Sequence, residues 1–358
     1  MRHLDRRNTS VMNAEQRYVR VSGPRQLEEL AGDEQRPAPD GVVVDITYSG
    51  ICGTDVHGYT DGHMLPPAVF GHEWTGTVRA IGDEVSHVRV GQRVIGGVGP
   101  ACGACRQCLA GHYRQCDTAF AEANGVDEAA PAHGAFATRV RVSARRVIPV
   151  PEGISDVEAA LVEPATVTFH AVRRTALEPG SVVVVQGAGP IGLLTAQHAR
   201  NAGAGQVIVS EPSPARRNAA EKLGFSEVVA PQDLPGLLSE ATGGLGADVL
   251  FECAGVASLL QPSAELVRRG GVLALLGFPL TESTVSYGDW QSRELTVIGS
   301  LAYNHEDFMG TMRAITQKRI DVASLHTGTV GLSQLGDMLE ELDSGKSAHA
   351  KVLVDPRA

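Results

Sequence analysis

The chain has 358 residues, of which 43% are hydrophobic and 20% charged, and its formal net charge is −10. This length allows about two domains, and the negative charge without a cluster of Lys or Arg excludes nucleic acid and anionic membranes as expected partners. Since neither a signal-peptide pattern nor a run of eighteen apolar residues occurs, we expect a soluble, cytoplasmic protein that acts on a small molecule. The 41 glycines favour an α/β chain over a helical bundle.

The first half of the chain is expected to be rich in β-strands. Residues 1–14 are polar and irregular, and we expect them to be disordered. From about residue 40 to 150, short β segments alternate with Gly and Pro, which predicts a β barrel-like domain. The segments are 42–48, 76–82, 91–96 and 135–142.

Candidate metal ligands stand in two motifs of this β-rich half. Cys52 lies in GICGTDVH, directly after a predicted strand, and His72 lies in GHE. A thiolate and an imidazole in turns bounded by glycine can converge on one ion. Each also has an ordinary interpretation, as a buried thiol or a hydrogen-bonded histidine. Glu163, in the VEP segment that enters the second half, is a third candidate, and an incompletely coordinated zinc is typical of catalysis.

Four of the six cysteines lie within the stretch CGACRQCLAGHYRQC. They are Cys102, Cys105, Cys108 and Cys116. In a cytoplasmic protein disulfides are disfavoured, and a redox dithiol would use only two of the sulfurs. Spacings of two, two and seven residues allow one loop, 100–117, to surround a tetrahedral zinc, with an iron–sulfur cluster as the main alternative. A zinc bound by four cysteines has no open position, so this loop is predicted to be structural.

The second half, after about residue 155, alternates predicted strands and helices. Continuous apolar runs predict parallel strands that are covered on both faces, and the segments between them predict helices. The strands are 181–186, 205–210, 248–253 and 271–277, and the helices include 190–202 and 214–223. This order is typical of a doubly wound parallel sheet.

A GxGxxG loop joins the first strand and first helix of this half. Its candidate cofactor-binding residues are Gly187, Gly189, Pro190, Ile191 and Gly192. Glycines at these positions let the chain turn and let a pyrophosphate approach the helix N-terminus. Glu211, at the end of the next strand, is expected to bind the adenosine ribose and to repel a 2′-phosphate, which favours NAD over NADP. Arg216 and Arg217 lie nearby and keep NADP open.

Together the motifs GICGTDVH, GHE, CxxCxxCx7C, VEP and GxGxxG, in this order and over nearly the whole chain after residue 15, resemble the zinc-dependent medium-chain alcohol and polyol dehydrogenases. Glu163, where primary-alcohol dehydrogenases commonly carry cysteine, is similar to the sorbitol, threonine and 2,3-butanediol dehydrogenase branch. The resemblance implies a GroES-like catalytic domain made of 1–163 and 300–358, into which a Rossmann domain of residues 164–299 is inserted. A helix at 305–318 and a strand at 351–354 would return to the catalytic domain.

The resemblance also implies the reaction and the roles of its residues. Zinc would act as a Lewis acid while hydride passes between a secondary alcohol or polyol and NAD. Each subunit would hold one catalytic and one structural zinc, and the chain would form a homodimer or homotetramer. Thr54 would contact the substrate oxygen and His57 would pass a proton toward solvent. Either Glu73 or Glu163 would complete the catalytic site, with Asp55 orienting His72.

Three alternatives remain open at this point. The chain is an NADP-dependent or carbonyl-reducing member of the same family, a zinc-free quinone or enoyl reductase on the same architecture, or a binding module with a vestigial nucleotide fold. The candidate ligands argue against the last two. Neither the identity of the alcohol nor the direction of the reaction follows from the sequence.

Overall fold

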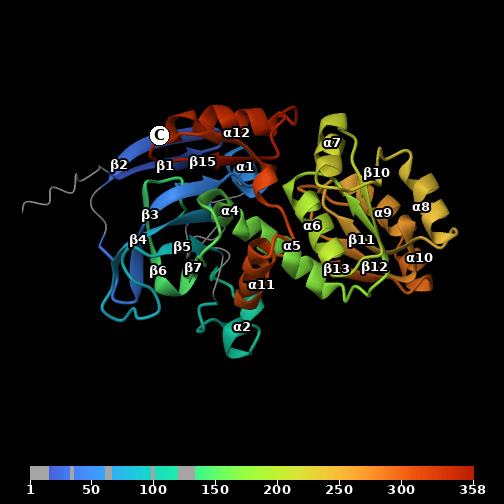
Figure 1. The fold of residues 1–358 in the computed structure, drawn as a ribbon, viewed down its shortest axis with the longest axis horizontal. Coiled ribbons are helices and arrows are strands. Elements are labelled where there is room, and N and C mark those ends of the chain that lie inside the picture. Colours follow the sequence, from blue (N-terminus) through green and yellow to red (C-terminus); the bar gives the residue numbers. More distant parts are fainter. Residues whose placement is uncertain (1–15, 33–35, 61–66, 98–100, 120–133) are drawn as a thin grey trace, which may run out of the picture.

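Two β-sheets organise the molecule, and helix α5 (Val162–Arg174) runs between them (Figure 1). The computed structural model describes residues 16–32, 36–60, 67–97, 101–119 and 134–358. The expected disorder of residues 1–14 lies outside these residues. Among the described helices, none is both long and apolar enough to span a bilayer.

The first sheet has seven strands and combines both parts of the chain that flank the second sheet. Its order is β14-β15-β3-β4-β5-β7, with β6 paired to β3. The strands are β3 (Gly41–Gly50), β4 (Glu73–Ile81), β5 (Arg93–Gly96), β6 (Arg139–Ser143), β7 (Val147–Pro149), β14 (His326–Val330) and β15 (Lys351–Val354). Alternate residues of β3, Val42, Val44 and Ile46, pack with Trp74 in one hydrophobic core. The β-rich character predicted for the first half of the chain is therefore confirmed.

A separate hairpin and three helices cover parts of this sheet. The hairpin is β1 (Gln16–Gly23) with β2 (Gln26–Gly32), and the helices are α1 (Gly53–Thr60), α4 (Asp156–Ala160) and α12 (Leu335–Asp343). The Tyr59 hydroxyl donates to Oε1 of Glu340 at 2.8 Å, which joins α1 to α12. Ser155 and Glu158 form a capping box that starts α4 and leads the chain directly into α5.

The second sheet is parallel throughout, as predicted. Its order is β10-β9-β8-β11-β12-β13, so β13 lies at one edge. The strands are β8 (Val182–Gln186), β9 (Gln206–Ser210), β10 (Val228–Val229), β11 (Ala247–Glu252), β12 (Val267–Leu275) and β13 (Thr296–Gly299). Helices α6 (Pro190–Asn201), α7 (Pro214–Lys222), α8 (Leu234–Thr242), α9 (Leu260–Leu266) and α10 (Tyr287–Ser292) lie between them. Val183, Val184 and Leu250 are fully buried, as strands covered on both faces require.

Helix α11 (His305–Thr316) packs on α5 and thereby fixes the position of the residues just before α11. Asp307 is buried and accepts from Nδ1 of His170 at 2.7 Å and from Arg173 at 2.6 Å. These bonds lower the pKa of Asp307 although burial opposes them. The short helix α2 (Arg106–Leu109) and the 3-10 turns η1 (Tyr113–Gln115), η2 (Ala144–Arg146), η3 (Ala257–Leu259), η4 (Ala323–Leu325) and η5 (Leu332–Gln334) complete the described elements.

Candidate metal centres and active site

The antiparallel pairing of β3 and β4 brings Cys52 and His72 together. Gly50, the last residue of β3, pairs with Glu73, the first residue of β4. Cys52 follows the end of one strand and His72 precedes the start of the other, so the two lie at the same end of the sheet. One ligand atom each from Cys52, His72 and Glu73 lies within 4.8 Å of the other two. The predicted proximity of Cys52 and His72 is thus present in the structure.

Asp55 fastens the two turns that carry these ligands. Its Oδ2 accepts from the backbone N–H of Cys52 at 2.9 Å, and its Oδ1 accepts from the N–H of Gly71 at 3.2 Å. Nδ1 of His72 lies 3.6 Å from Oδ1 of Asp55, beyond an ordinary hydrogen bond, and is buried without a bonding partner among the described residues. Burial lowers the pKa of His72, but the Asp55 carboxylate outweighs it and raises the pKa well above the usual value. Asp55 therefore faces the histidine ring as the sequence suggested.

Glu73 is held by a lysine from the other end of the chain. Nζ of Lys351 donates to Oε1 and Oε2 of Glu73 at 2.8 and 2.7 Å, and to the Ile51 carbonyl at 2.9 Å. Lys351 and Glu73 are 4% and 1% exposed, so this is a buried ion pair. A Cβ on Gly50 would stand 2.2 Å from Oε2 of Glu73, which explains a glycine there. Burial lowers the pKa of Lys351, but Glu73 more than offsets this and raises it.

Glu163 lies beside this cluster without belonging to its closest set of ligands. It is in the first turn of α5, 4% exposed, and its Oε1 accepts from the Tyr303 hydroxyl at 2.7 Å. Burial raises the pKa of Glu163 to about 7; Glu73 adds to this rise, while His72 and Lys351 oppose it. Two buried carboxylates thus lie near the same positive charge. Glu73 is paired with Lys351, and Glu163 is bonded to Tyr303.

The two residues expected to handle the proton, Thr54 and His57, both belong to α1. Oγ1 of Thr54 lies 3.6 Å from Sγ of Cys52, so the hydroxyl borders the metal cluster. His57 is one turn further along the helix and half-buried. A group at Thr54 can therefore contact a molecule at the cluster, whereas His57 lies one helical turn away.

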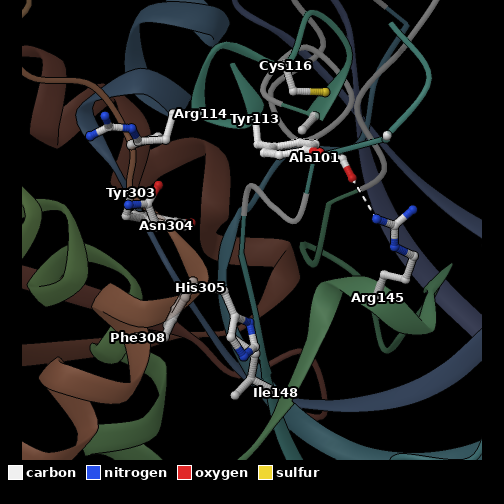
Figure 2. A pocket seen from close by; sticks show the side chains of 13 residues that line it. Ala101, Tyr113, Arg114, Cys116, Arg145, Ile148, Tyr303, Asn304, His305 and Phe308 are labelled. Carbon is white, nitrogen blue, oxygen red and sulfur yellow. Dashed lines mark hydrogen bonds between the residues drawn. The ribbon is translucent and has the colours of Figure 1, made fainter. Parts of the chain in front are cut away.

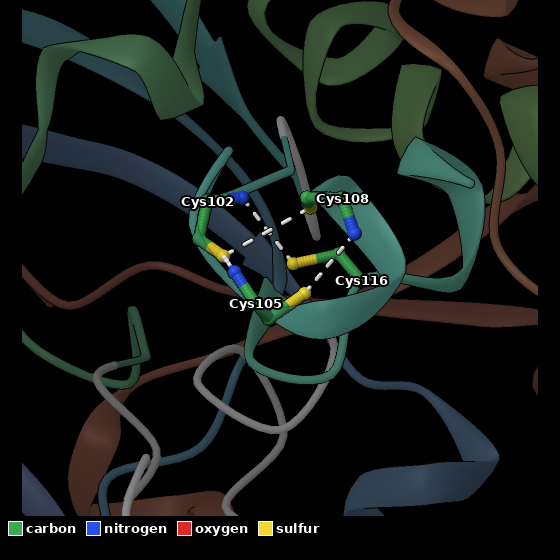
Figure 3. A group of neighbouring side chains, drawn as sticks. All are labelled: Cys102, Cys105, Cys108 and Cys116. Atoms are coloured by element: carbon green, nitrogen blue, oxygen red, sulfur yellow. Dashed lines mark hydrogen bonds between the residues drawn. The ribbon is translucent and has the colours of Figure 1, made fainter. Parts of the chain in front are cut away.

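The four cysteines of residues 102–116 point their sulfurs toward a common centre (Figure 3). Sγ of Cys102 lies 3.9 Å from Sγ of Cys108, close to the ~3.8 Å that sulfurs at 2.3 Å from a tetrahedral zinc would have. Backbone N–H groups point at the sulfurs: those of Ala104 and Cys105 at Cys102 (3.4 and 3.3 Å), and that of Cys102 at Cys116 (3.2 Å). The donor set and its spacing fit a structural zinc.

These backbone donors stabilise thiolates. The N–H groups of Ala104 and Cys105 lower the pKa of Cys102 to about 6. Burial raises the pKa of Cys116, but backbone donors, the N–H of Cys102 foremost, leave it lowered. Burial raises the pKa of Cys108 to about 12. Since a metal binds the thiolate form, backbone donors favour that form at Cys102 and Cys116, whereas Cys108 needs the charge of the ion.

The glycine-rich loop has the geometry that a pyrophosphate site needs. Gly187 has φ 95°, and a Cβ on Gly192 would stand 1.8 Å from the Gly187 carbonyl oxygen. A Cβ on Gly189, by contrast, would meet nothing within 4 Å, so the backbone at the start of α6 borders open space that a phosphate could fill. Pro190 and Ile191 open the helix itself.

Glu211 joins this loop to the next strand. Its Oε2 accepts from the N–H of Ala188 at 2.7 Å and its Oε1 from the N–H of Ser213 at 2.9 Å. Glu211 is 3% exposed, whereas Arg216 is exposed. Arg217 donates to the backbone carbonyls of Glu211 and Pro212, so its charge is attached to this turn.

Sequence reasoning missed Lys351 and the bond of Tyr303. The signal for Lys351 was present, because a lone lysine begins the otherwise apolar run KVLV, and a buried lysine requires an acidic partner. Which acid it meets depends on β15 lying next to β3. Nothing in the sequence placed the Tyr303 hydroxyl on Glu163.

Comparisons with known proteins agree with this fold and cluster. The family model described as alcohol dehydrogenase GroES-like domain matches residues 38–152, and that described as zinc-binding dehydrogenase matches residues 190–317. Sorbitol dehydrogenase of Bacillus subtilis is 34% identical over 336 residues, covering 90% of this chain and 93% of the relative.

Solved structures show the same architecture. The structure of 2R,3R-butanediol dehydrogenase from Bacillus subtilis is 28% identical, with a TM-score of 0.83, covering 95% of this chain and 99% of the other. A structure from Sinorhizobium meliloti, described as a zinc-binding dehydrogenase bound to NADP, is 29% identical with a TM-score of 0.84, covering 96% and 100%.

The chain belongs to the zinc-dependent medium-chain alcohol and polyol dehydrogenases, as its motifs predicted. It is an oxidoreductase of that family. Sorbitol and butanediol dehydrogenases among its relatives support the alcohol and polyol interpretation, and none of these comparisons supports a quinone or enoyl reductase.

Proposed function

We propose that the protein is an NAD-dependent dehydrogenase of secondary alcohols or polyols. The observation that carries this proposal is the cluster of Cys52, His72 and Glu73, which offers a thiolate, an imidazole and a carboxylate at one end of the first sheet. Such a mixed set is typical of zinc sites that keep a position open for substrate. When bound, zinc supplies a Lewis acid that lowers the pKa of a substrate hydroxyl, and NAD accepts the hydride.

The chain's own side chains position the substrate and remove its proton. Thr54, beside Cys52, accepts a hydrogen bond from the alcohol and passes the proton toward His57 and solvent. Lys351 holds Glu73 in an ion pair, and Asp55 faces the ring of His72. Glu163 is the acid we propose as the exchangeable ligand, because Tyr303 rather than a cation holds it and its pKa is near neutral.

The choice of NAD over NADP rests on Glu211. Its buried carboxylate lies beside the glycine-rich loop, where a 2′-phosphate would meet a negative charge. Glu211→Gln keeps the shape and removes the charge, so kcat/KM with NADP should rise relative to NAD by about tenfold. An unchanged ratio, or wild-type preference for NADP, would count against Glu211 as the selector. The NADP-bound relative makes this comparison necessary.

We further propose two zinc ions per chain, the second held by the four cysteines of residues 102–116. All six cysteines of the chain are free, which fits ligand use in a reducing, cytoplasmic setting.

We propose a homodimer or homotetramer, with the edge strand β13 as a contact. Val297 on this strand and Leu301 just beyond it are 39% and 58% exposed. Light scattering on the purified protein measures the assembly.

A single assay tests the main proposal. Purified protein is mixed with NAD and a panel of neutral diols, hexitols, threonine and bulky secondary alcohols, and absorbance at 340 nm is followed, with elemental analysis on the same sample. We expect NADH formation with a diol or polyol and about two zinc ions per chain. Absence of zinc, or turnover that persists after a chelator has removed it, contradicts the proposal.

A further inference from the structure

A cavity of about 300 Å³ lies between the cysteine loop and the start of α11 (Figure 2). This volume is at the lower end of the range of small-molecule sites, about 300–1,000 Å³. Three parts of the chain line it: the loop that carries the four cysteines, the turn between β6 and β7, and the segment that leads into α11. The lining residues that matter below are Tyr113, Arg114, Arg145, Tyr303, Asn304 and His305.

Among the described residues that line this cavity, the charged side chains are two arginines, and a histidine lies with them. Arg114 and Arg145 flank Tyr113 in Figure 2, and His305 lies on the α11 side. No carboxylate is among the described lining residues, although the whole chain carries a net charge of −10. Positive charge gathered in a concave site of an acidic protein draws anions selectively into it.

The two arginines are held differently. Arg145 donates to the carbonyl oxygens of Ala101 and Cys102 at 3.0 and 3.3 Å, which fixes its guanidinium without neutralising it. Arg114 is exposed at the cavity, and no hydrogen bond or ion pair joins it to another described residue. Five N–H donors in a planar fork are therefore free to bind two oxygens of a carboxylate or phosphate.

The start of α11 adds a weaker attraction for anions. Asn304 caps this helix and His305 is its first residue, so the positive end of the helix dipole borders the cavity. Asp307 in the first turn is buried and paired with His170 and Arg173, and it does not line the cavity. Glu306 is exposed and likewise outside the lining.

Tyr303 lies between the cavity and the reaction centre. This residue lines the cavity, and its hydroxyl donates to Glu163, which lies beside the Cys52 and His72 cluster. A molecule with one oxygen at the metal cluster would have to pass Tyr303 for its far end to reach Arg114. An elongated polyol has the required shape, and an anionic group at its far end would meet the arginines.

We propose that the substrate is a polyol with a terminal anionic group, a carboxylate or a phosphate, which Arg114 and Arg145 bind in this cavity. This inference rests on the proposed dehydrogenase function and narrows it to a substrate class. The reaction itself is unchanged: the carbinol C–H gives a hydride to NAD, the hydroxyl gives a proton to solvent, and the anionic end takes no part. The cavity thus selects substrates by their charge.

The test compares substrates of matched length. Sorbitol is neutral, gluconate carries a carboxylate and sorbitol 6-phosphate a phosphate, so the three separate the possible sources of charge. Each is assayed with wild type, Arg114→Ala and Arg114→Lys. The control Arg106→Ala removes the same charge from the same loop, because Arg106 is exposed on α2 but does not line the cavity.

We expect at least one anionic compound to have a lower KM than sorbitol in the wild type. In Arg114→Ala its KM should rise at least about tenfold while kcat changes little, since a remote contact contributes equally to ground and transition states. Arg114→Lys should raise the KM of the anionic compound less than Arg114→Ala does, and Arg106→Ala should leave it close to the wild-type value. Equal effects of Arg114→Ala and Arg106→Ala on KM, or a wild-type preference for sorbitol, overturn the inference.

A binding measurement separates this inference from the proposed function. Calorimetric titration of the wild-type holoenzyme with gluconate and with sorbitol 6-phosphate needs no turnover. Binding that is lost in Arg114→Ala and kept in Arg106→Ala supports the anion site even if none of the three compounds is oxidised. Oxidation of neutral polyols without binding of either anion sustains the dehydrogenase proposal and defeats the inference.

Discussion

The two clusters of candidate metal ligands are built on opposite plans. The cysteine loop takes its four ligands from residues 102–116, and its own backbone N–H groups bond the sulfurs. The other cluster takes Cys52, His72 and Glu73 from separate turns and strands, and it relies on Asp55 and Lys351 to hold them. A site of one ligand type can be encoded within one loop, whereas the proposed open site, with Glu163 as its exchangeable acid, draws its residues from distant parts of the fold.

The largest effect should follow from breaking the open cluster. Cys52→Ser replaces a thiolate by a neutral hydroxyl, a poor zinc ligand, so kcat/KM should fall about a thousandfold or more. Zinc content should fall by one ion per chain, with the cysteine loop still loaded. Circular dichroism serves as the control for folding. Full activity in this variant would show that Cys52 is not part of the reaction centre.

Removing the ion pair between Lys351 and Glu73 tests whether the Cys52 cluster depends on strand β15. Lys351→Met leaves a buried carboxylate without its cation, which should lower the free energy of unfolding by about 3–5 kcal/mol. Urea denaturation of the zinc-loaded protein measures this. The double variant with Glu73→Gln should recover most of the loss, because the carboxylate that lost its partner is then removed as well. If Lys351→Met were as stable as wild type, the pair would contribute nothing.

The closed loop should respond in stability rather than chemistry. Cys108 is 2% exposed, and Cys108→Ser removes one of four ligands, so the loop should lose its ion. A metal present at a hundredfold excess over its dissociation constant adds about 2.7 kcal/mol of stability, and that amount should be lost. Thermal unfolding and kcat/KM are measured on one sample, with kcat/KM expected within about threefold of wild type. A stable but inactive variant would reverse the two roles.

The smallest effect should come from Asp55. Asp55→Asn keeps the shape of the side chain but replaces one of its two acceptor oxygens by an NH2 group. That group then faces a backbone N–H, either that of Cys52 or that of Gly71. Zinc affinity at the Cys52 cluster should fall about 10–100-fold, as is common when a group that orients a ligand is changed. Release to a chromogenic chelator should accelerate in one of two phases. Acceleration of both phases would mean that Asp55 acts on the fold as a whole.

The sequence predicts what is local in the chain. The spacing of Cys102, Cys105, Cys108 and Cys116 was sufficient to place four sulfurs around one centre, and the glycine-rich loop predicted a turn that the structure contains. Both depend on backbone geometry within a few residues. The proximity of Cys52 and His72 came from turn chemistry and from the family resemblance together.

The sequence did not predict contacts between distant segments. Lys351 and Glu73 are 278 residues apart, and Tyr303 and Glu163 are 140 apart, so each pair depends on strand order and helix packing. Arg216, a candidate for binding the cofactor, is exposed, while Arg217 bonds backbone carbonyls beside Glu211. Which of two adjacent arginines faces Glu211 depends on the direction in which each side chain leaves the helix. Sequence spacing alone does not show that direction.

The insertion of β15 between β14 and β3 has a consequence for how the protein is made. A ribosome adds about 5–20 residues per second, so the 278 residues from Glu73 to Lys351 take roughly 14–56 s to emerge. During that interval the acid has no lysine to meet, and the first sheet lacks two of its strands. The continuous segment 182–299 already holds every strand of the parallel sheet and can fold first. The nascent chain would thus assemble its nucleotide-binding half before its catalytic half.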